Sequence, residues 1–503
     1  MEYKRPAPEA HEAKFKPRLI IHGGAGNIPS RDKMPPETYA AYRKSLLTII
    51  SKTDTFMRTP LSPYSSKQEQ QPKYPSALAI TTYAVTLLED DALFNAGHGA
   101  VFTRDGINEL EASVMVSRPS SHAHKRGVGV TGLRRVRNPI QLARAVLEHG
   151  DADLSPTATA AGADDAHTDR RGETAATEGL DVPSAQGHTL IHGATAEALA
   201  QQYGLALVPS SYFYTQKRWD EHVRGLERAR RLRGGGGAAP IAATWSPDEY
   251  LPQGTCGAVA LDADGVLCAA TSTGGLTNKL TGRIGDTPVV GAGFWAEEWQ
   301  DDEDGEGKEN YRQEGWRSYL SNGGPAIELS SALRGFLADC LPSPFLYTPL
   351  TAAAAVQQQQ QQRKKKAGDD RIVTTRATAI SGTGNGDSFL RTAAARSVAA
   401  MARWGVVPVA EALFRIAGPG GELQRSASDR WGRTGEGEGG MIGIETVVRR
   451  DAATGRVVSG GGVSAAVVMH DHNSPGMYRA WIDDAGTARF KIWRDYEDED
   501  FSA

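Results

Sequence analysis

Residues 254–275 read GTCGAVALDADGVLCAATSTGG, and this stretch decides the fold. Its alternating small and apolar residues predict a strand that begins at or just after Thr255, and a second strand over 266–270. The Asp262-Ala-Asp-Gly265 segment between them is a hairpin signal, so we expect Thr255 and Thr273 to be spatial neighbours. Taken alone, a Gly-Thr pair at a strand start is also explained as a turn residue followed by a β-former.

The composition is that of an ordinary globular protein. Hydrophobic residues make up 40% and charged residues 23% of 503 residues, and the net charge is -4. No segment has the apolar length of a signal peptide or a membrane span, so we expect a cytoplasmic protein without nucleic-acid or membrane partners. Three scattered thiols, Cys256, Cys268 and Cys340, exclude a disulfide framework and a zinc site, and Cys256 fits a small buried strand residue.

Periodicity and turn residues outline the other elements. A strand over 18–21 is expected to run into a glycine turn at 22–26, and helices are expected over 77–88, 138–150 and 194–203. Ser76 is the expected N-cap of the first helix, and Pro139 takes the first position of the second. Low-complexity composition predicts disordered insertions at about 151–187 and 300–372 and a flexible linker at about 227–252. The basic run 363–366 fits a solvated charge run better than a nuclear signal.

Thr255 has the setting that a self-activating nucleophile needs. A threonine hydroxyl is a weak nucleophile without a base, and a free α-amino group, with a pKa of roughly 7.7 to 8.0, could serve if the preceding peptide bond were cut. Gly254 has no Cβ to obstruct attack on its carbonyl. Farther on, Arg283 and Asp286 could grip the carboxylate and ammonium of an amino-acid substrate, or could form a plain surface ion pair.

The HGGAG block at 22–26 lacks both the dinucleotide glycine spacing and the Walker lysine, so a nucleotide site is not expected. Taken with NAGHG at 95, the 254–293 block, SGTGNGD at 381 and PGMYRAW at 475, the chain resembles the plant-type L-asparaginase and isoaspartyl aminopeptidase family of N-terminal nucleophile threonine hydrolases. The resemblance implies an α+β fold, a four-layer αββα sandwich, with self-cleavage before Thr255. The α chain would be 1–254 and the β chain 255–503, assembled as a dimer of αβ heterodimers.

The resemblance also implies roles for individual residues. Thr255 would be the nucleophile and Thr273 would hydrogen-bond it, with Asn95 supporting the same region. Arg283 and Asp286 would bind the substrate, in a pocket shaped by Gly386. Thr383 and Gly384 would be the oxyanion donors. The family has no catalytic cofactor, but it carries a structural sodium ion on backbone carbonyls; the matching positions are Leu88, Glu89, Asp91, Phe94, Ala96 and His98.

The implied activity is hydrolysis of L-asparagine or β-aspartyl (isoaspartyl) dipeptides with release of L-aspartate. The chain departs from the family at Glu111-Ala-Ser-Val-Met115, which continues as Val116-Ser117, and in the long insertion between Gly293 and Ser381. The Gly-Phe-Trp-Ala-Glu run at 293 resembles the threonine aspartase branch, a protein-cleaving alternative, but that branch lacks the Arg283 and Asp286 pairing. The other alternative is an uncleaved, inactive scaffold protein.

Overall fold

The computed structural model describes part of the chain in atomic detail: residues 15–61, 73–118, 127–153, 182–233, 254–301, 372–405, 407–452, 454, 457–458 and 465–494. The chain forms two compact units, the larger made of 13–299, 376–447 and 463–503, the smaller of 1–12, 300–375 and 448–462. The smaller unit contributes only short described stretches. Cys340, the run 363–366 and most of the insertions and linker expected from the sequence lie outside the described residues.

The larger unit contains two β-sheets. The first has eight strands in the order β12-β11-β1-β5-β6-β2-β3-β4, and the second has four in the order β10-β9-β8-β7. All of the paired strands in the first sheet are antiparallel except β3 and β4. Mixed helices and mainly antiparallel sheets confirm the α+β class. The strands are β1 (Arg18–Gly26), β2 (Leu110–Val116), β3 (Gly127–Leu133), β4 (Leu190–His192), β5 (Cys256–Leu261), β6 (Leu267–Thr273), β7 (Phe294–Asp301), β8 (Ile372–Gly384), β9 (Gly439–Asp451), β10 (Ala465–His472), β11 (Gly476–Ile482) and β12 (Ala488–Lys491).

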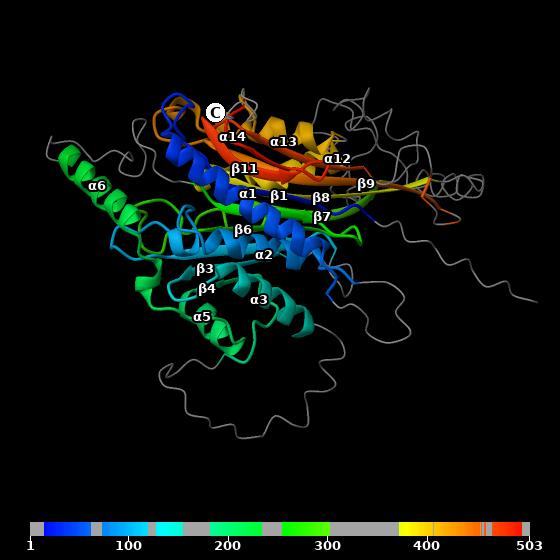
Figure 1. Ribbon diagram of the computed structural model, residues 1–503, viewed down its shortest axis with the longest axis horizontal. Helices are drawn as coiled ribbons and strands as arrows, with labels where there is room; N and C mark the ends of the chain where they lie inside the picture. Colours follow the sequence, from blue (N-terminus) through cyan, green and yellow to red (C-terminus); the bar gives the residue numbers. More distant parts are fainter. Residues whose placement is uncertain are drawn as a thin grey trace, which may run out of the picture. The chain divides into compact units, whose positions relative to one another are not determined.

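The helices divide between the two sheets. Those that contact the eight-stranded sheet are α1 (Pro36–Arg58), α2 (Ala77–Glu89), α3 (Pro139–Asp153) and α5 (Gly193–Gln202). A second group follows β8: α11 (Gly386–Thr392), α12 (Ala394–Trp404), α13 (Val409–Ala417) and α14 (Glu422–Ser426), of which α13 contacts β10. The last described helix before Gly254 is α6 (Gln216–Arg233). Figure 1 shows α2 beside the strands of the first sheet and α12 and α13 beside those of the second. None of the described helices combines the length and apolar character needed to cross a bilayer.

Three apolar clusters fill the unit. One joins α1, α2, α3 and α5 to one face of the eight-stranded sheet, and another joins α11 to α14 with the four-stranded sheet. The third is made of residues from strands of both sheets, such as Val259 of β5 and Ile442 of β9. Each fully buried aliphatic side chain contributes roughly 1.5–3 kcal/mol, so these clusters dominate the stability of the unit.

The hairpin predicted from residues 254–275 is confirmed. Strand β5 pairs antiparallel with β6, with Cys256 opposite Ser272, and Gly265 takes a φ of +79° in the turn. Alternate residues of β5 point to opposite faces: Cys256 lies in the helix-side cluster, and Val259 lies in the cluster shared by the two sheets. Cys256 is therefore the buried strand residue that its sequence context indicates.

Helix α2 is also confirmed, since the Ser76 side chain accepts a hydrogen bond from the Ala79 amide and caps it.

Other boundaries need correction. Residues 22–26 are not a turn after β1 but part of it, because a bulge between His22 and Gly24 lets the strand continue its pairing with β11. Helix α3 runs past Gly150 to Asp153, and residues 227–233, expected in the linker, form the last turns of α6.

Candidate active site

Thr255 lies immediately before β5, with only 3% of its surface exposed. Because Cys256 pairs with Ser272, the next pair of positions along the two strands is Thr255 and Thr273, so these residues are neighbours as the hairpin predicts. The hydroxyl partners are different from those that the resemblance implies. Thr273 Oγ1 accepts a hydrogen bond from the Gly275 amide at 3.0 Å, while Thr255 Oγ1 lies 3.1 Å from Thr287 Oγ1. Thr287 is a contact that the sequence analysis missed.

The peptide before Thr255 is packed against β1. A Cβ placed on Gly254 would lie 2.2 Å from Gly24 Cα and 2.8 Å from the Ala25 nitrogen. Gly24 has a φ of +119°, a conformation that favours glycine, and a Cβ there would lie 3.0 Å from Gly254 Cα. Glycine is therefore required on both sides of this contact, which explains the role of the HGGAG block next to the Gly254–Thr255 bond.

Thr383, at the end of β8, reaches the same place. Its Oγ1 accepts a hydrogen bond from the Ala25 amide at 3.1 Å, so the hydroxyl proton is left to be donated to another group. Gly384 follows with a φ of +144°, and a Cβ on it would lie 2.4 Å from the Glu438 carbonyl oxygen. Ala25 thus links the predicted oxyanion donors to Gly254.

Arg283 and Asp286 converge on Gly386. A Cβ on Gly386 would lie 2.7 Å from Asp286 Oδ1 and 3.0 Å from Arg283 Nη2, so the structure brings these three predicted residues together. Arg283 donates to the mostly exposed carboxylate of Asp387 at 3.2 Å. Asp286 is buried, and among the described residues its Oδ2 has no hydrogen-bond partner. Burial, opposed by the nearby Arg283 charge, raises the pKa of Asp286 to about 7. Such a carboxylate favours a cationic ligand.

Two carboxylates, one just before β2 and one within it, hold the loop that carries this pair. Glu109 Oε2 accepts from the Gly282 amide at 2.7 Å, and Glu111 Oε1 accepts from the Gly285 amide at 3.2 Å. Glu111 Oε1 also accepts from the Thr131 hydroxyl at 3.1 Å. Glu111, where the sequence departs from the family motif, therefore anchors the predicted substrate loop from strand β2.

The long insertion does not separate the two loops in space. The Gly382 amide donates to the Gly293 carbonyl oxygen at 2.8 Å, so the segments that flank residues 302–371 are in contact. The predicted substrate loop before Gly293 and the predicted oxyanion loop after Ser381 are therefore neighbours in space.

Asn95 stabilises a turn, and among the described residues its side chain makes no hydrogen bond to Thr255. Its Nδ2 donates to the Gly275 carbonyl oxygen at 2.7 Å, and its Oδ1 accepts from the Val101 amide at 3.1 Å. Because the Gly275 amide bonds Thr273, Asn95 holds the chain that follows Thr273. The His22 ring is buried, and its Nε2 lies 2.7 Å from Ser381 Oγ. Burial, opposed by a hydrogen bond with the Thr255 backbone, lowers the pKa of His22 to about 3, so the ring is neutral.

The end of α2 and the loop after it contain the positions matched to the sodium ion. Two glycines keep a space clear beside backbone carbonyls. A Cβ on Gly97 would lie 2.4 Å from the Glu89 oxygen, and one on Gly99 would lie 2.1 Å from the Phe94 oxygen and 2.6 Å from the Ala92 oxygen. Uncharged carbonyl oxygens around a space of this kind suit a hard cation, so the loop fits the ion. Among the described residues, no group of three or more His, Cys, Asp or Glu side chains is placed to hold a metal ion.

A buried guanidinium braces this loop from α6. Arg218 donates through Nε to the Gly99 oxygen at 2.8 Å and through Nη2 to the Leu93 oxygen at 3.0 Å, and it pairs with Glu221 at 3.1 Å. Its side chain is completely buried. Sequence periodicity gives no hint of this role, because a basic residue in a charged helix is typical of an exposed face.

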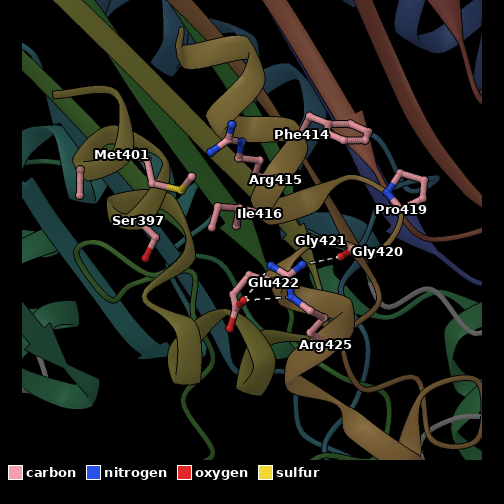
Figure 2. Close-up of a pocket in the computed structure, with 11 residues that line it drawn as sticks. Ser397, Met401, Phe414, Arg415, Ile416, Pro419, Gly420, Gly421, Glu422 and Arg425 are labelled. Atoms are coloured by element: carbon pink, nitrogen blue, oxygen red, sulfur yellow. Dashed lines mark hydrogen bonds and ion pairs between the residues drawn. The ribbon is translucent and has the colours of Figure 1, made fainter. Parts of the chain in front are cut away.

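A separate hollow of about 730 Å³ lies between α12, α13 and α14 (Figure 2). Its polar lining includes Arg425, which pairs with Glu422 at 3.1 Å and donates to the Gly420 oxygen at 3.0 Å. None of the predicted site residues lines it, so the candidate active site remains the Thr255 group.

Comparisons with known proteins give matches within one family. The profile of the Asparaginase family matches residues 15–163 and 179–300. The chain is 36% identical over 278 residues to the isoaspartyl peptidase of Escherichia coli, covering 55% of this chain and 67% of that protein. It is 30% identical over 286 residues to the isoaspartyl peptidase/L-asparaginase of Xenopus laevis, covering 56% and 67%. It is 33% identical over 280 residues to the plant-type L-asparaginase of Pyrobaculum calidifontis, covering 56% and 70%.

Proposed function

This chain belongs to the asparaginase family, and from that premise we propose that it is a self-cleaving threonine hydrolase acting on L-asparagine and β-aspartyl dipeptides. The observation that carries the proposal is the grouping around the Gly254–Thr255 bond. Thr383 reaches this bond through Ala25, while Arg283 and Asp286 offer charges for an amino acid next to the oxyanion loop.

Self-cleavage would begin with attack of Thr255 Oγ1 on the Gly254 carbonyl carbon. The carbonyl electron pair moves onto oxygen, where the Thr383 hydroxyl and Gly384 amide would stabilise the charge. The C–N bond then breaks as the Oγ1 proton passes to the Thr255 nitrogen, which leaves an ester. Water cleaves the ester and gives an α chain ending at Gly254 and a β chain beginning at Thr255.

In the matured enzyme, the free α-amino group of Thr255 would take the hydroxyl proton during attack on the substrate's side-chain amide. The leaving group is ammonia from asparagine, or an amino acid from a β-aspartyl dipeptide, and it carries the transferred proton away. Water then attacks the aspartyl ester with the same amine as base, releases L-aspartate and restores the hydroxyl.

Asp286 and Arg283 support the choice of a small zwitterionic substrate. The buried Asp286 carboxylate gains a cation when the substrate ammonium binds, and Arg283 can exchange its exposed partner Asp387 for the substrate α-carboxylate. Gly386 leaves room beside both groups. A protein substrate would present an α-carboxylate only at its end, so this pairing favours asparagine and dipeptides over protein cleavage.

Three further properties are part of the proposal. The three apolar clusters support a four-layer αββα sandwich, with the two sheets sharing the central cluster. The matured α and β chains would pair, and two such heterodimers would form a dimer. A sodium ion would be held by backbone carbonyl oxygens, including those of Glu89 and Phe94. Its positive charge would stabilise the loop that carries Asn95.

The direct test is aspartate release by purified, matured protein, with Thr255→Ala as the control. We expect release from L-asparagine and from a β-aspartyl dipeptide, and none from the control. Cleavage of folded proteins at aspartate without release from either small substrate would favour the threonine aspartase alternative. No hydrolysis of any of these substrates by a chain that stays whole would favour the scaffold alternative.

A further inference from the structure

The hydroxyl of Thr287 lies 3.1 Å from that of Thr255, and we propose that Thr287 is a positioning residue for the nucleophile in both self-cleavage and hydrolysis. The inference rests on the proposed function and deepens it. Thr287 is 1% exposed, so water does not compete for this hydrogen bond, and the bond can fix the orientation of the Thr255 hydroxyl. Either hydroxyl can be the donor.

The backbone of Thr287 is fixed by hydrogen bonds to its own carbonyl oxygen and by those that close the turn around it. Its carbonyl oxygen accepts from Ser113 Oγ at 2.6 Å and from Thr271 Oγ1 at 3.3 Å, on strands β2 and β6. The turn that contains it is closed by hydrogen bonds from the Val289 and Gly293 amides to the Asp286 carbonyl oxygen, at 3.0 and 3.2 Å. A side chain with a fixed backbone and a branched Cβ has few rotamers, so the position of the Thr287 hydroxyl is restricted.

Both reactions require a fixed orientation of the Thr255 hydroxyl. In both reactions Thr255 Oγ1 must direct a lone pair at a carbonyl carbon while it loses its proton, to its own nitrogen in self-cleavage and to its free α-amino group in hydrolysis. A hydrogen bond to Thr287 selects the rotamer that does this and is not consumed in either step. The same turn carries Asp286, so one rigid segment would set both the substrate ammonium and the attacking hydroxyl.

The test compares Thr287→Val, which keeps the shape and loses the hydroxyl, with Thr287→Ser, which keeps the hydroxyl. We expect the valine variant to lose about ten- to a hundredfold in the self-cleavage rate and in kcat per matured β chain, with KM for L-asparagine changed by less than about twofold. The serine variant should stay within about threefold of wild type. Thr55→Val, which removes an exposed hydroxyl on α1 that donates to the Ser51 carbonyl oxygen at 2.9 Å, is the matched control and should change neither rate.

A valine variant that cleaves itself and hydrolyses L-asparagine at wild-type rates would overturn the inference. A serine variant with rates as low as those of the valine variant would do the same. So would a valine variant in which only KM is changed. If the valine variant does not fold by thermal unfolding, Thr287→Cys replaces it: cysteine matches serine in size, and a tenfold deficit relative to serine is expected. Equal rates for cysteine and serine would refute the role. Wild type and Thr255→Ala run in parallel, and an uncleaved wild type would refute the proposed function itself, a separate result from a failure of Thr287.

Discussion

The ionised carboxylate of Asp286 should lower the free energy of unfolding, because it is buried, and it should also bind the ammonium group of the substrate. The pKa of Asp286 is about 7 in the folded chain against an ordinary 3.8, so the folded state binds this proton more tightly than the unfolded state. Stability from this group is therefore fully present below about pH 4 and is lost as the pH rises to about 7. At ~1.4 kcal/mol per pH unit, the raised pKa lowers the free energy of unfolding, relative to its value at acid pH, by about 4 kcal/mol at pH 8 and by less than about 2 kcal/mol at pH 5.

Asp286→Asn removes this titration. In a Thr255→Ala background, which keeps one chain, urea unfolding should show the asparagine variant more stable than its parent by up to about 4 kcal/mol at pH 8 and by less than about 2 kcal/mol at pH 5. In the otherwise wild-type enzyme, the same change should raise KM for L-asparagine about tenfold or more, because the ammonium loses its partner. A variant that is no more stable at pH 8, or whose gain is equal at both pH values, would refute the reasoning.

Three substitutions probe the other parts of the site. Gly386→Ala places a Cβ 2.7 Å from Asp286 Oδ1 and 3.0 Å from Arg283 Nη2, so KM for L-asparagine should rise at least about tenfold in steady-state kinetics; an unchanged KM would contradict the placement of the substrate. Thr383→Val should lower kcat per matured β chain by about 10²- to 10³-fold, and a loss below about threefold would remove Thr383 from the oxyanion site. Arg218→Met should lower stability by about 3–5 kcal/mol in urea unfolding, because it leaves buried partners unpaired; a change under about 1 kcal/mol would show that the loop does not depend on the guanidinium.

Local signals in the sequence predicted the parts of the fold that depend on neighbouring residues. The β5 and β6 hairpin follows from period-two alternation and the Asp262-to-Gly265 turn, and the start of α2 follows from the Ser76 cap. Where long-range pairing competes with local preference, the prediction failed. The glycines at 22–26 indicate a turn by themselves, but pairing with β11 keeps them in β1.

The family motif predicted that Arg283 and Asp286 lie together, and the structure brings both beside Gly386, while the roles of these residues and of Thr255 stay predictions. The site was not predictable where a role depends on a hydroxyl contact between distant segments. Thr287 follows Asp286 directly in the quoted block, yet nothing in its spacing shows that its hydroxyl meets that of Thr255. Likewise, the partner of Thr273 is the Gly275 amide because the turn after β6 folds back on that hydroxyl.

The central claim is that the Gly254–Thr255 bond is cut by Thr255. N-terminal sequencing and intact mass measurement of purified protein, incubated beside Thr255→Ala, test it most directly. We expect two chains from the wild type, the second beginning Thr-Cys-Gly-Ala-Val, and a single whole chain from the variant. A wild-type chain that stays whole, a cut at another bond, or the same cut in Thr255→Ala would contradict this claim.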